Sequence, residues 1–121
     1  MNIMIVEDES VTAMLMSKFL KLKGYQISGL AATGEEAIEL INKEIPDLIL
    51  MDIQLADKMN GIDAITEIRE THQIPVIFLT GYPEENIRLQ ADKLNPIAFF
   101  TKPILLNKLA DTLNNLFKKI D

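Results

Sequence analysis

The chain has 121 residues, 48% of them hydrophobic, which suits one compact domain over residues 1–121 and leaves too little for a second. A formal net charge of −6 argues against direct contact with nucleic acid, and the lack of cysteine excludes disulfides and thiolate metal sites. No apolar run approaches the roughly 18 to 20 residues of a membrane span, so we expect a cytoplasmic protein without a membrane partner.

Five short apolar runs recur along the chain and predict five β-strands. Three of them, IMIV, LILM and VIFL, are apolar without alternation, which is typical of strands covered on both faces by helices. The predicted strands are Ile3–Val6, Gln26–Ala31, Asp47–Met51, Pro75–Thr80 and Ile97–Phe100.

Helical patterns follow each of these strands. The first helical pattern predicts a helix with an apolar face made of Val11, Leu15, Phe19 and Leu22, which ends at Gly24. The resulting alternation of strand and helix predicts an α/β protein of (βα)5 type with a parallel sheet.

The later helices differ in how strongly they are patterned. The second begins at TGEE, where Thr33 and Glu36 fit a capping box. The fourth, around Glu84–Leu94, has few apolar residues in register, so we expect it to be the least firmly packed. The third carries Ala64, Ile65 and Ile68, and the fifth a stripe of Leu106, Leu109, Leu113, Leu116 and Ile120.

Polar side chains follow four of the predicted strands. In an open parallel sheet, the functional crevice lies at the carboxyl ends of the strands. The first strand runs into Glu7 and Asp8, the third into Asp52, the fourth ends in Thr80 and the fifth runs into Lys102. The sequence therefore predicts that these five side chains share one pocket.

The acids in this set are suited to a magnesium ion. Hard oxygen ligands without His or Cys favour Mg²⁺, which takes one or two protein carboxylates and keeps several waters. We expect Asp8 and Asp52 to bind the ion directly, Glu7 directly or through water, and the main-chain carbonyl of Gln54 to add an oxygen. Such an ion would leave one oxygen of Asp52 free as a nucleophile toward phosphorus.

The remaining residues of the set fit a phosphoryl group. Phosphoryl transfer depends mainly on positioning and on neutralising charge. Lys102 offers a positive charge, Thr80 a hydroxyl donor, and Gly81 leaves room for the incoming group.

Each residue taken singly has a plainer interpretation. Asp8 could be a helix cap, Thr80 an ordinary strand residue, Lys102 a solvated lysine at a sheet edge, and Phe99 a core aromatic. The specificity of the functional interpretation therefore comes from the whole set and its order.

These residues resemble the receiver domain of two-component response regulators over essentially the whole chain. The matching segments are IMIVEDE, PDLILMDIQL, IPVIFLTG and FFTKP. The resemblance implies a three-layer α/β/α, flavodoxin-like fold with strand order 2-1-3-4-5. It also implies Mg²⁺-dependent transfer of a phosphoryl group from a phosphohistidine to Asp52, followed by hydrolysis.

The resemblance also implies roles for individual residues. Glu7 and Asp8 would be the metal-binding acids, Thr80 the switch hydroxyl, Lys102 the phosphate contact and Phe99 the switch aromatic. Phosphorylation would draw Thr80 inward, let Phe99 rotate and alter the face formed by the fourth helix, fifth strand and fifth helix. The Lys102–Pro103 bond would be cis.

The family's known partners are implied in the same way. The phosphoryl donor would be a sensor histidine kinase or a histidine phosphotransfer domain. The altered face would act on a downstream effector, an attached output domain or a second copy of the chain.

The sequence departs from the usual receiver pattern after the acceptor. Ala56 stands where many receivers have proline, and one extra residue precedes Asn60–Gly61. Gln54 and Tyr82 are candidates for tuning reaction rates, and we hypothesise that the bulky Tyr82 shields the acyl phosphate from water and slows self-dephosphorylation.

Three other functions compete with this interpretation. An aspartate-nucleophile phosphatase of the haloacid dehalogenase type usually has a second aspartate two residues after the first, where this chain has Gln54. A flavin binder would need a phosphate-friendly loop where EDES stands. A receiver that only docks proteins would not need the complete set of acids, hydroxyl and lysine, so we expect a phosphoacceptor signalling domain rather than an enzyme.

Overall fold

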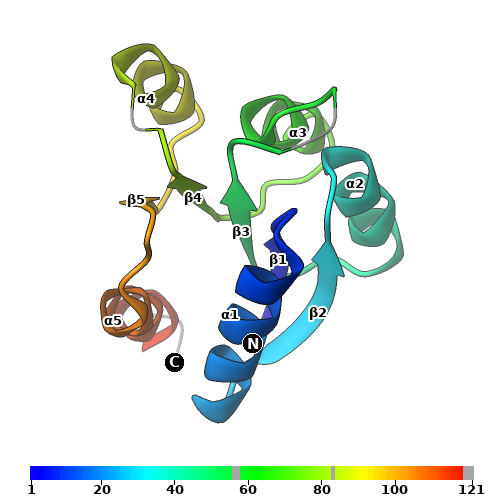
Figure 1. Ribbon diagram of the computed structural model, residues 1–121. Helices are drawn as coiled ribbons and strands as arrows, with labels where there is room; N and C mark the ends of the chain where they lie inside the picture. Colours follow the sequence, from blue (N-terminus) through cyan, green and yellow to red (C-terminus); the bar gives the residue numbers. More distant parts are fainter. Residues whose placement is uncertain (56–57, 83, 119–121) are drawn as a thin grey trace.

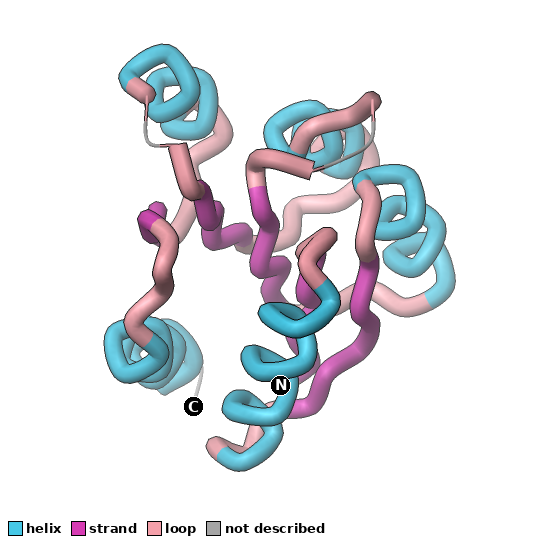
Figure 2. The backbone as a smooth tube through the Cα atoms, viewed as in Figure 1, coloured by secondary structure: helices cyan, strands magenta, loops and turns pink. Residues whose placement is uncertain are grey.

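The computed structural model describes residues 1–55, 58–82 and 84–118, which form a parallel sheet between two layers of helices (Figures 1 and 2). The strands are β1 (Asn2–Val6), β2 (Gln26–Ala31), β3 (Leu48–Asp52), β4 (Val76–Thr80) and β5 (Ala98–Thr101). The helices are α1 (Ser10–Leu22), α2 (Gly34–Lys43), α3 (Gly61–Ile68), α4 (Glu85–Asp92) and α5 (Leu106–Lys118). The predicted strands lie within one residue of the observed ones.

All neighbouring strands are parallel, in the order β2-β1-β3-β4-β5. The predicted (βα)5 architecture and strand order are therefore confirmed. The chain places β2 on one side of β1 and then adds β3, β4 and β5 on the other side, so β1 and β3 are neighbours in the sheet. This is the topological switch point at which open α/β sheets bind their ligands.

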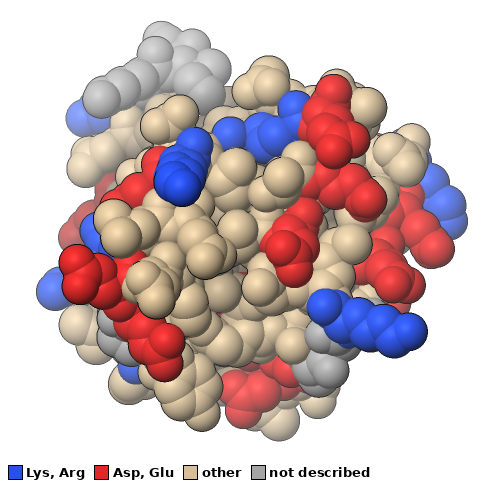
Figure 3. Space-filling model, turned by 90° about the horizontal axis from the view of Figure 1, so that it is seen from above, with Lys and Arg blue, Asp and Glu red and all other residues tan. Residues whose placement is uncertain are grey.

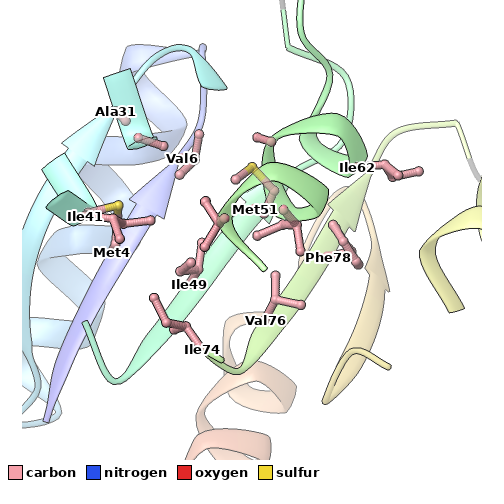
Figure 4. Close-up of a cluster of buried hydrophobic side chains, with 14 of the residues drawn as sticks. Met4, Val6, Ala31, Ile41, Ile49, Met51, Ile62, Ile74, Val76 and Phe78 are labelled. Atoms are coloured by element: carbon pink, nitrogen blue, oxygen red, sulfur yellow. The ribbon is translucent and has the colours of Figure 1, made fainter. Parts of the chain in front are cut away.

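Alternate residues of the central strands supply two separate cores. Met4, Ile49 and Phe78 point to the core covered by α2, α3 and α4, part of which is drawn in Figure 4. Their neighbours Ile5, Leu50 and Ile77 point to the core covered by α1 and α5. Because both faces are covered, the strands need apolar side chains at every position, which explains their lack of alternation.

Of the four residues predicted for the packed face of α1, Phe19 packs against the core, but the other three are exposed. Val11, Leu15 and Leu22 are 67%, 58% and 84% exposed. The buried face instead contains Ala13, Met16, Ser17 and Leu20. The helix is apolar around most of its circumference, so periodicity alone did not distinguish the packed face from the exposed one.

The capping box predicted for α2 forms only in part. The side chain of Thr33 accepts a hydrogen bond from the Glu36 backbone N–H at 3.1 Å, as expected. The Glu36 carboxylate accepts from the backbone N–H of Ala32 at 2.8 Å rather than from that of Thr33. A complete capping box, which the sequence analysis did not identify, begins α3 with Asn60 and Asp63.

The α4 helix is held less firmly than the others, as predicted. Ala91 is its one buried residue, whereas each of the other helices buries at least three within the described residues. Its carboxyl end is anchored by Arg69, whose Nη1 donates to the Leu94 carbonyl at 2.8 Å. The same guanidinium donates to the Ile74 carbonyl, so it joins the end of α4 to the loop before β4.

The α5 helix follows its predicted stripe where it is described. Leu109 and Leu113 are fully buried, and Leu106 and Leu116 pack against the same core. Ile120, the last residue of the predicted stripe, lies outside the described residues. No helix in the described ranges combines the length and apolar character of a membrane span.

Gly61 fixes the start of α3 against the end of β3. Its backbone N–H donates to the Ile53 carbonyl at 2.9 Å. A Cβ atom here would overlap the Asp52 carbonyl oxygen and would lie 2.9 Å from the Ile53 Cα. Only glycine permits this close approach of the two backbones.

We therefore expect Gly61→Ala to lower the free energy of unfolding by about 1 to 3 kcal/mol, because backbone must move to admit the methyl group. Urea denaturation measures this change. Gly81→Ala is the matched control, since a Cβ there would meet no atom within 4 Å. Equal stability of the two variants would contradict the close-packing explanation.

Candidate functional site

The register of the parallel strands brings the acids together. Val6 on β1 pairs with Met51 on β3, so the next residues, Glu7 and Asp52, emerge side by side at the carboxyl edge of the sheet. Asp8 follows directly, and one carboxylate oxygen from each of the three acids lies within 4.8 Å of the others. The predicted clustering of acids from distant segments is what the structure contains.

Lys102 joins two of these acids. Its Nζ donates to both carboxylate oxygens of Glu7 at 2.9 Å and to Asp52 Oδ2 at 3.0 Å. Its side chain is 20% exposed, and its backbone N–H donates to the Thr80 carbonyl at 2.7 Å. Lys102 is thus an ion-paired residue of the site rather than a solvated lysine at a sheet edge. Its peptide bond to Pro103 is cis.

Burial and neighbouring charges set the protonation of this cluster. Burial, reinforced by Asp52 and opposed by Lys102, raises the pKa of Glu7 from 4.5 to about 7. Burial alone would lower the pKa of Lys102, but its bonds to Glu7 and Asp52 raise that pKa above its ordinary value. Lys102 is therefore held as a cation, while Glu7 takes up a proton more readily than an ordinary glutamate.

Asp8 does not cap the helix that follows it. The N-cap residue of α1 is Glu9, and no side chain provides a capping hydrogen bond there. Asp8 is half-buried beside Glu7 and Asp52. The plainer interpretation of Asp8 as a cap is therefore wrong.

A cleft of about 400 Å³ lies over Asp8 and Asp52. Figure 3 looks onto this edge of the sheet and shows acidic side chains both near the centre and around the rim of the face. The residues that line the cleft are Asp8, Glu9, Asp52, Gln54, Gly81, Tyr82 and Lys102.

Thr80 and Gly81 contact Gln54 on the far side of this cleft. Thr80 is fully buried and its hydroxyl donates to Gln54 Oε1 at 2.7 Å. The Gly81 backbone N–H donates to the same oxygen at 3.1 Å. The Gln54 backbone N–H in turn donates to Asp52 Oδ1 at 3.1 Å. Gln54 thus connects the Asp52 carboxylate to the end of β4.

Phe99 lies away from the acids. It is half-buried on β5, pairs in register with Phe78 and packs against the core beneath α4. The guanidinium carbon of Arg88, on α4, lies 4.4 Å from the centre of its ring. Phe99 is therefore part of the contact between β5 and α4, rather than part of the cleft.

The predictions for Ala56 and for the Gln54 main-chain carbonyl are not tested by the described residues. Ala56 lies outside the described residues. The acidic cluster consists of side chains of Glu7, Asp8 and Asp52. The role of the Gln54 main-chain carbonyl as a metal ligand therefore stays a prediction.

The cluster has the chemistry of a magnesium site. Three carboxylates with no nitrogen or sulfur donor match a hard divalent cation. A cation would also reduce the repulsion between acids that a single lysine only partly offsets. The residues present therefore fit Mg²⁺.

Comparison with known proteins agrees with this geometry. The family model of the response regulator receiver domain matches residues 3–114. The chain belongs to this family. Receiver domains are the signalling domains of response regulators in two-component systems, so the expected family and fold are confirmed.

The relatives of this receiver domain include proteins of different lengths. The phyllosphere-induced regulator PhyR of Methylorubrum extorquens is 38% identical over 103 residues, which cover 84% of this chain but 38% of PhyR. The chemotaxis protein CheY of Thermotoga maritima is 30% identical over 118 residues, which cover 97% of this chain and 98% of CheY. The chain therefore matches only part of PhyR but nearly all of CheY.

A solved structure with the same fold is the CheX–CheY–BeF3–Mg²⁺ complex from Borrelia burgdorferi. One chain of it superposes with a TM-score of 0.87 at 25% identity, covering 96% of this receiver domain and 88% of that chain.

Sequence reasoning missed three polar contacts of the receiver domain. They are the bonds of the Gln54 side chain to Thr80 and Gly81, the stacking of Arg88 on Phe99, and the anchoring of α4 by Arg69. Each depends on the spatial position of a loop or helix end, for which the sequence has no periodic pattern.

The raised pKa of Glu7 predicts a pH dependence of stability in the metal-free protein. Between pH 4.5 and about 7 the folded state holds a proton that the unfolded chain has released, so the free energy of unfolding falls as pH rises. Glu7→Gln removes the titrating group and should flatten this fall. Urea denaturation over this pH range, in the presence of a chelator, measures the slope.

Glu39→Gln, an exposed change on α2, is the control and should keep the wild-type slope. If the free energy of unfolding falls with pH equally steeply in Glu7→Gln and in the wild type, burial of Glu7 is not the source of the pH dependence.

Proposed function

We propose that this receiver domain accepts a phosphoryl group on Asp52 in a Mg²⁺-dependent reaction and so changes the surface formed by α4, β5 and α5. The observation that supports it most strongly is the grouping of Asp52, Glu7 and Lys102 through bonds of 2.9 to 3.0 Å, with Asp8 beside them. This grouping supports the proposal because a carboxylate that could accept the phosphoryl group, acids that could bind Mg²⁺ and an ion-paired lysine lie next to one another.

The proposed reaction forms a bond between an Asp52 carboxylate oxygen and phosphorus. The bond that breaks joins phosphorus to an imidazole nitrogen of a phosphohistidine, and the leaving imidazole takes up a proton. Lys102 neutralises charge on the carboxylate and the transferred group. Asp8 and Asp52, with Glu7 directly or through water, would hold Mg²⁺, which would supply positive charge against the added negative charge.

The second step is hydrolysis of the acyl phosphate. Water attacks phosphorus, the bond from phosphorus to the Asp52 oxygen breaks, and the products are inorganic phosphate and the free carboxylate. The domain thus assists both its own phosphorylation and its own dephosphorylation, without turning over a separate substrate as an enzyme does.

The signal leaves the site through Thr80. Three acceptor oxygens and about 1.5 to 2 negative charges appear where one carboxylate oxygen stood, and they attract the Thr80 hydroxyl and the Gly81 N–H. Inward movement of Thr80 gives Phe99 space to rotate. The α4 helix packs on Phe99 through Arg88 and buries one residue, so it is the element that responds most easily.

The partners we propose follow from this chemistry. A sensor histidine kinase or a histidine phosphotransfer domain would supply the phosphoryl group and must contact the surface next to the cleft. That surface is partly apolar: Leu15, Pro103 and Ile104 line a groove that shares Glu9 and Lys102 with the cleft. The changed surface would act on an effector, an output domain or a second copy of the chain.

The alternative functions fit the site less well. A phosphatase of the haloacid dehalogenase type needs an acid two residues after the nucleophile, and Gln54 there binds Thr80 through a neutral amide. A docking module without phosphorylation would have no use for two buried acids bound to one lysine.

The acceptor is tested with acetyl phosphate and with beryllofluoride, each with and without Mg²⁺. We expect the wild type to gain one phosphoryl group and to bind beryllofluoride only when Mg²⁺ is present. Asp52→Asn should do neither, because an amide is not a nucleophile toward phosphorus. Mass spectrometry and fluorine NMR detect the two products.

Asp111→Asn, an exposed change on α5, controls for the loss of one carboxylate. Phosphorylation that persists in Asp52→Asn, or that is lost equally in Asp111→Asn, would place the acceptor elsewhere.

Tyr82 is proposed to slow hydrolysis. Its side chain is 66% exposed and lines the cleft beside Asp52. We expect Tyr82→Ala to lose its phosphoryl group about threefold faster or more, because water reaches phosphorus more easily. Loss of radiolabel from the purified phosphoprotein measures the rate.

Tyr82→Phe keeps the ring and should keep the slow rate. Shielding by the ring is ruled out if the alanine variant is no faster than the phenylalanine variant.

A further inference from the structure

The side chain of Gln54 holds the two hydrogen-bond donors at the end of β4. Its Oε1 accepts from the Thr80 hydroxyl at 2.7 Å and from the Gly81 N–H at 3.1 Å. Gln54 and Gly81 both line the cleft above Asp52. The donors that face the acceptor are thus already occupied by an oxygen of the protein itself.

The direction of these bonds is fixed by the backbone. The Gly81 N–H can only donate, so the Gln54 atom opposite it is the carbonyl oxygen and not the amide nitrogen. The Thr80 hydroxyl oxygen accepts from the Tyr82 N–H at 3.0 Å, which leaves its proton for Gln54. The two donors, the Thr80 hydroxyl and the Gly81 N–H, are therefore both occupied.

The same Gln54 side chain leaves one polar group unsatisfied. Its Nε2 is buried and has no hydrogen-bond partner among the described residues. A buried donor without a partner is unfavourable. The arrangement is stabilised at Oε1 and destabilised at Nε2, so it is suited to release when a better acceptor enters the cleft.

We propose that the Gln54 side chain is a latch, in which Oε1 occupies the Thr80 hydroxyl and the Gly81 N–H in place of phosphoryl oxygens. Phosphorylation of Asp52 then requires this amide to be displaced. Gln54 is a positioning residue that acts through Thr80 and Gly81, and it leaves the bonds from Lys102 to Glu7 and Asp52 intact. The inference rests on the proposed function of Asp52.

The latch has a measurable consequence for anion affinity. A phosphoryl group, or beryllofluoride as its mimic, must break two existing hydrogen bonds before it can use the same donors. Removing Oε1 while keeping the side-chain volume should therefore tighten binding. Gln54→Met makes this change, and Gln73→Met, at an exposed site preceding β4, is the matched control.

The experiment measures the dissociation constant of beryllofluoride in saturating Mg²⁺. We expect Gln54→Met to bind about tenfold more tightly than the wild type, a difference of about 1.4 kcal/mol, and Gln73→Met to bind as the wild type does. In a Thr80→Val background the gain from Gln54→Met should shrink, because the hydroxyl that it releases is absent.

Amide hydrogen exchange, followed by NMR, tests the latch in the wild type itself, so the result does not depend on a variant folding correctly. Gly81 is exposed, yet its amide proton should exchange slowly in the unphosphorylated wild type because it is bonded to Gln54. In Gln54→Met the same proton should exchange faster and its chemical shift should move upfield. Fast exchange of this proton in the wild type would overturn the latch.

The outcomes separate this inference from the proposed function. A wild type that binds no beryllofluoride in Mg²⁺ would overturn the phosphoacceptor function itself. A wild type that binds it, with Gln54→Met binding equally or more weakly, would overturn the latch alone. A gain of the same size in the Thr80→Val background would show that Gln54 does not act through the Thr80 hydroxyl.

Discussion

The ion pairs from Lys102 to Glu7 and Asp52 are the interaction on which the site of this receiver domain depends. Two acids emerge side by side from the central strands, and a single ammonium group bonds both. Without it, two carboxylates at about 4 Å would repel each other by about 4 kcal/mol at an effective dielectric of 20. Burial, reinforced by Asp52, raises the pKa of Glu7 despite its bonds to Lys102. The three clustered carboxylates therefore still fit a divalent cation.

Topology explains why these charges meet where they do. The switch point places β1 next to β3, and the parallel register aligns the residues that follow Val6 and Met51. On the other side of β3, Ile53 donates to the Leu79 carbonyl, which brings Thr80 to the same edge. Gly61 then lets the backbone of α3 approach Asp52 closely. The backbone around Asp52 is consequently held by main-chain contacts on both sides.

The opposite side of the cleft is held less firmly. Thr80 and Gly81 are bonded to a side-chain amide rather than to main chain, and α4 beyond them buries a single residue within the described part of the chain. Arg69 holds the carboxyl end of α4 through the Leu94 carbonyl, while the amino end has no side-chain cap. The backbone around Asp52 is thus held by main-chain contacts, whereas the neighbouring α4 is held weakly, as expected of an element that opens locally.

The sequence by itself determined the (βα)5 architecture, because apolar runs covered on both faces and the helical patterns between them are local properties of the chain. It also predicted that Glu7, Asp52 and Lys102 meet at one edge of the sheet, since the rule that ligands bind at strand carboxyl ends applies to them once the strands are located. Only the tertiary structure decided which face of α1 packs on the sheet and what the Gln54 side chain contacts. These depend on how one element meets another: a helix apolar on most sides has several possible packing faces, and an amide bonds whichever donors the fold places within its reach.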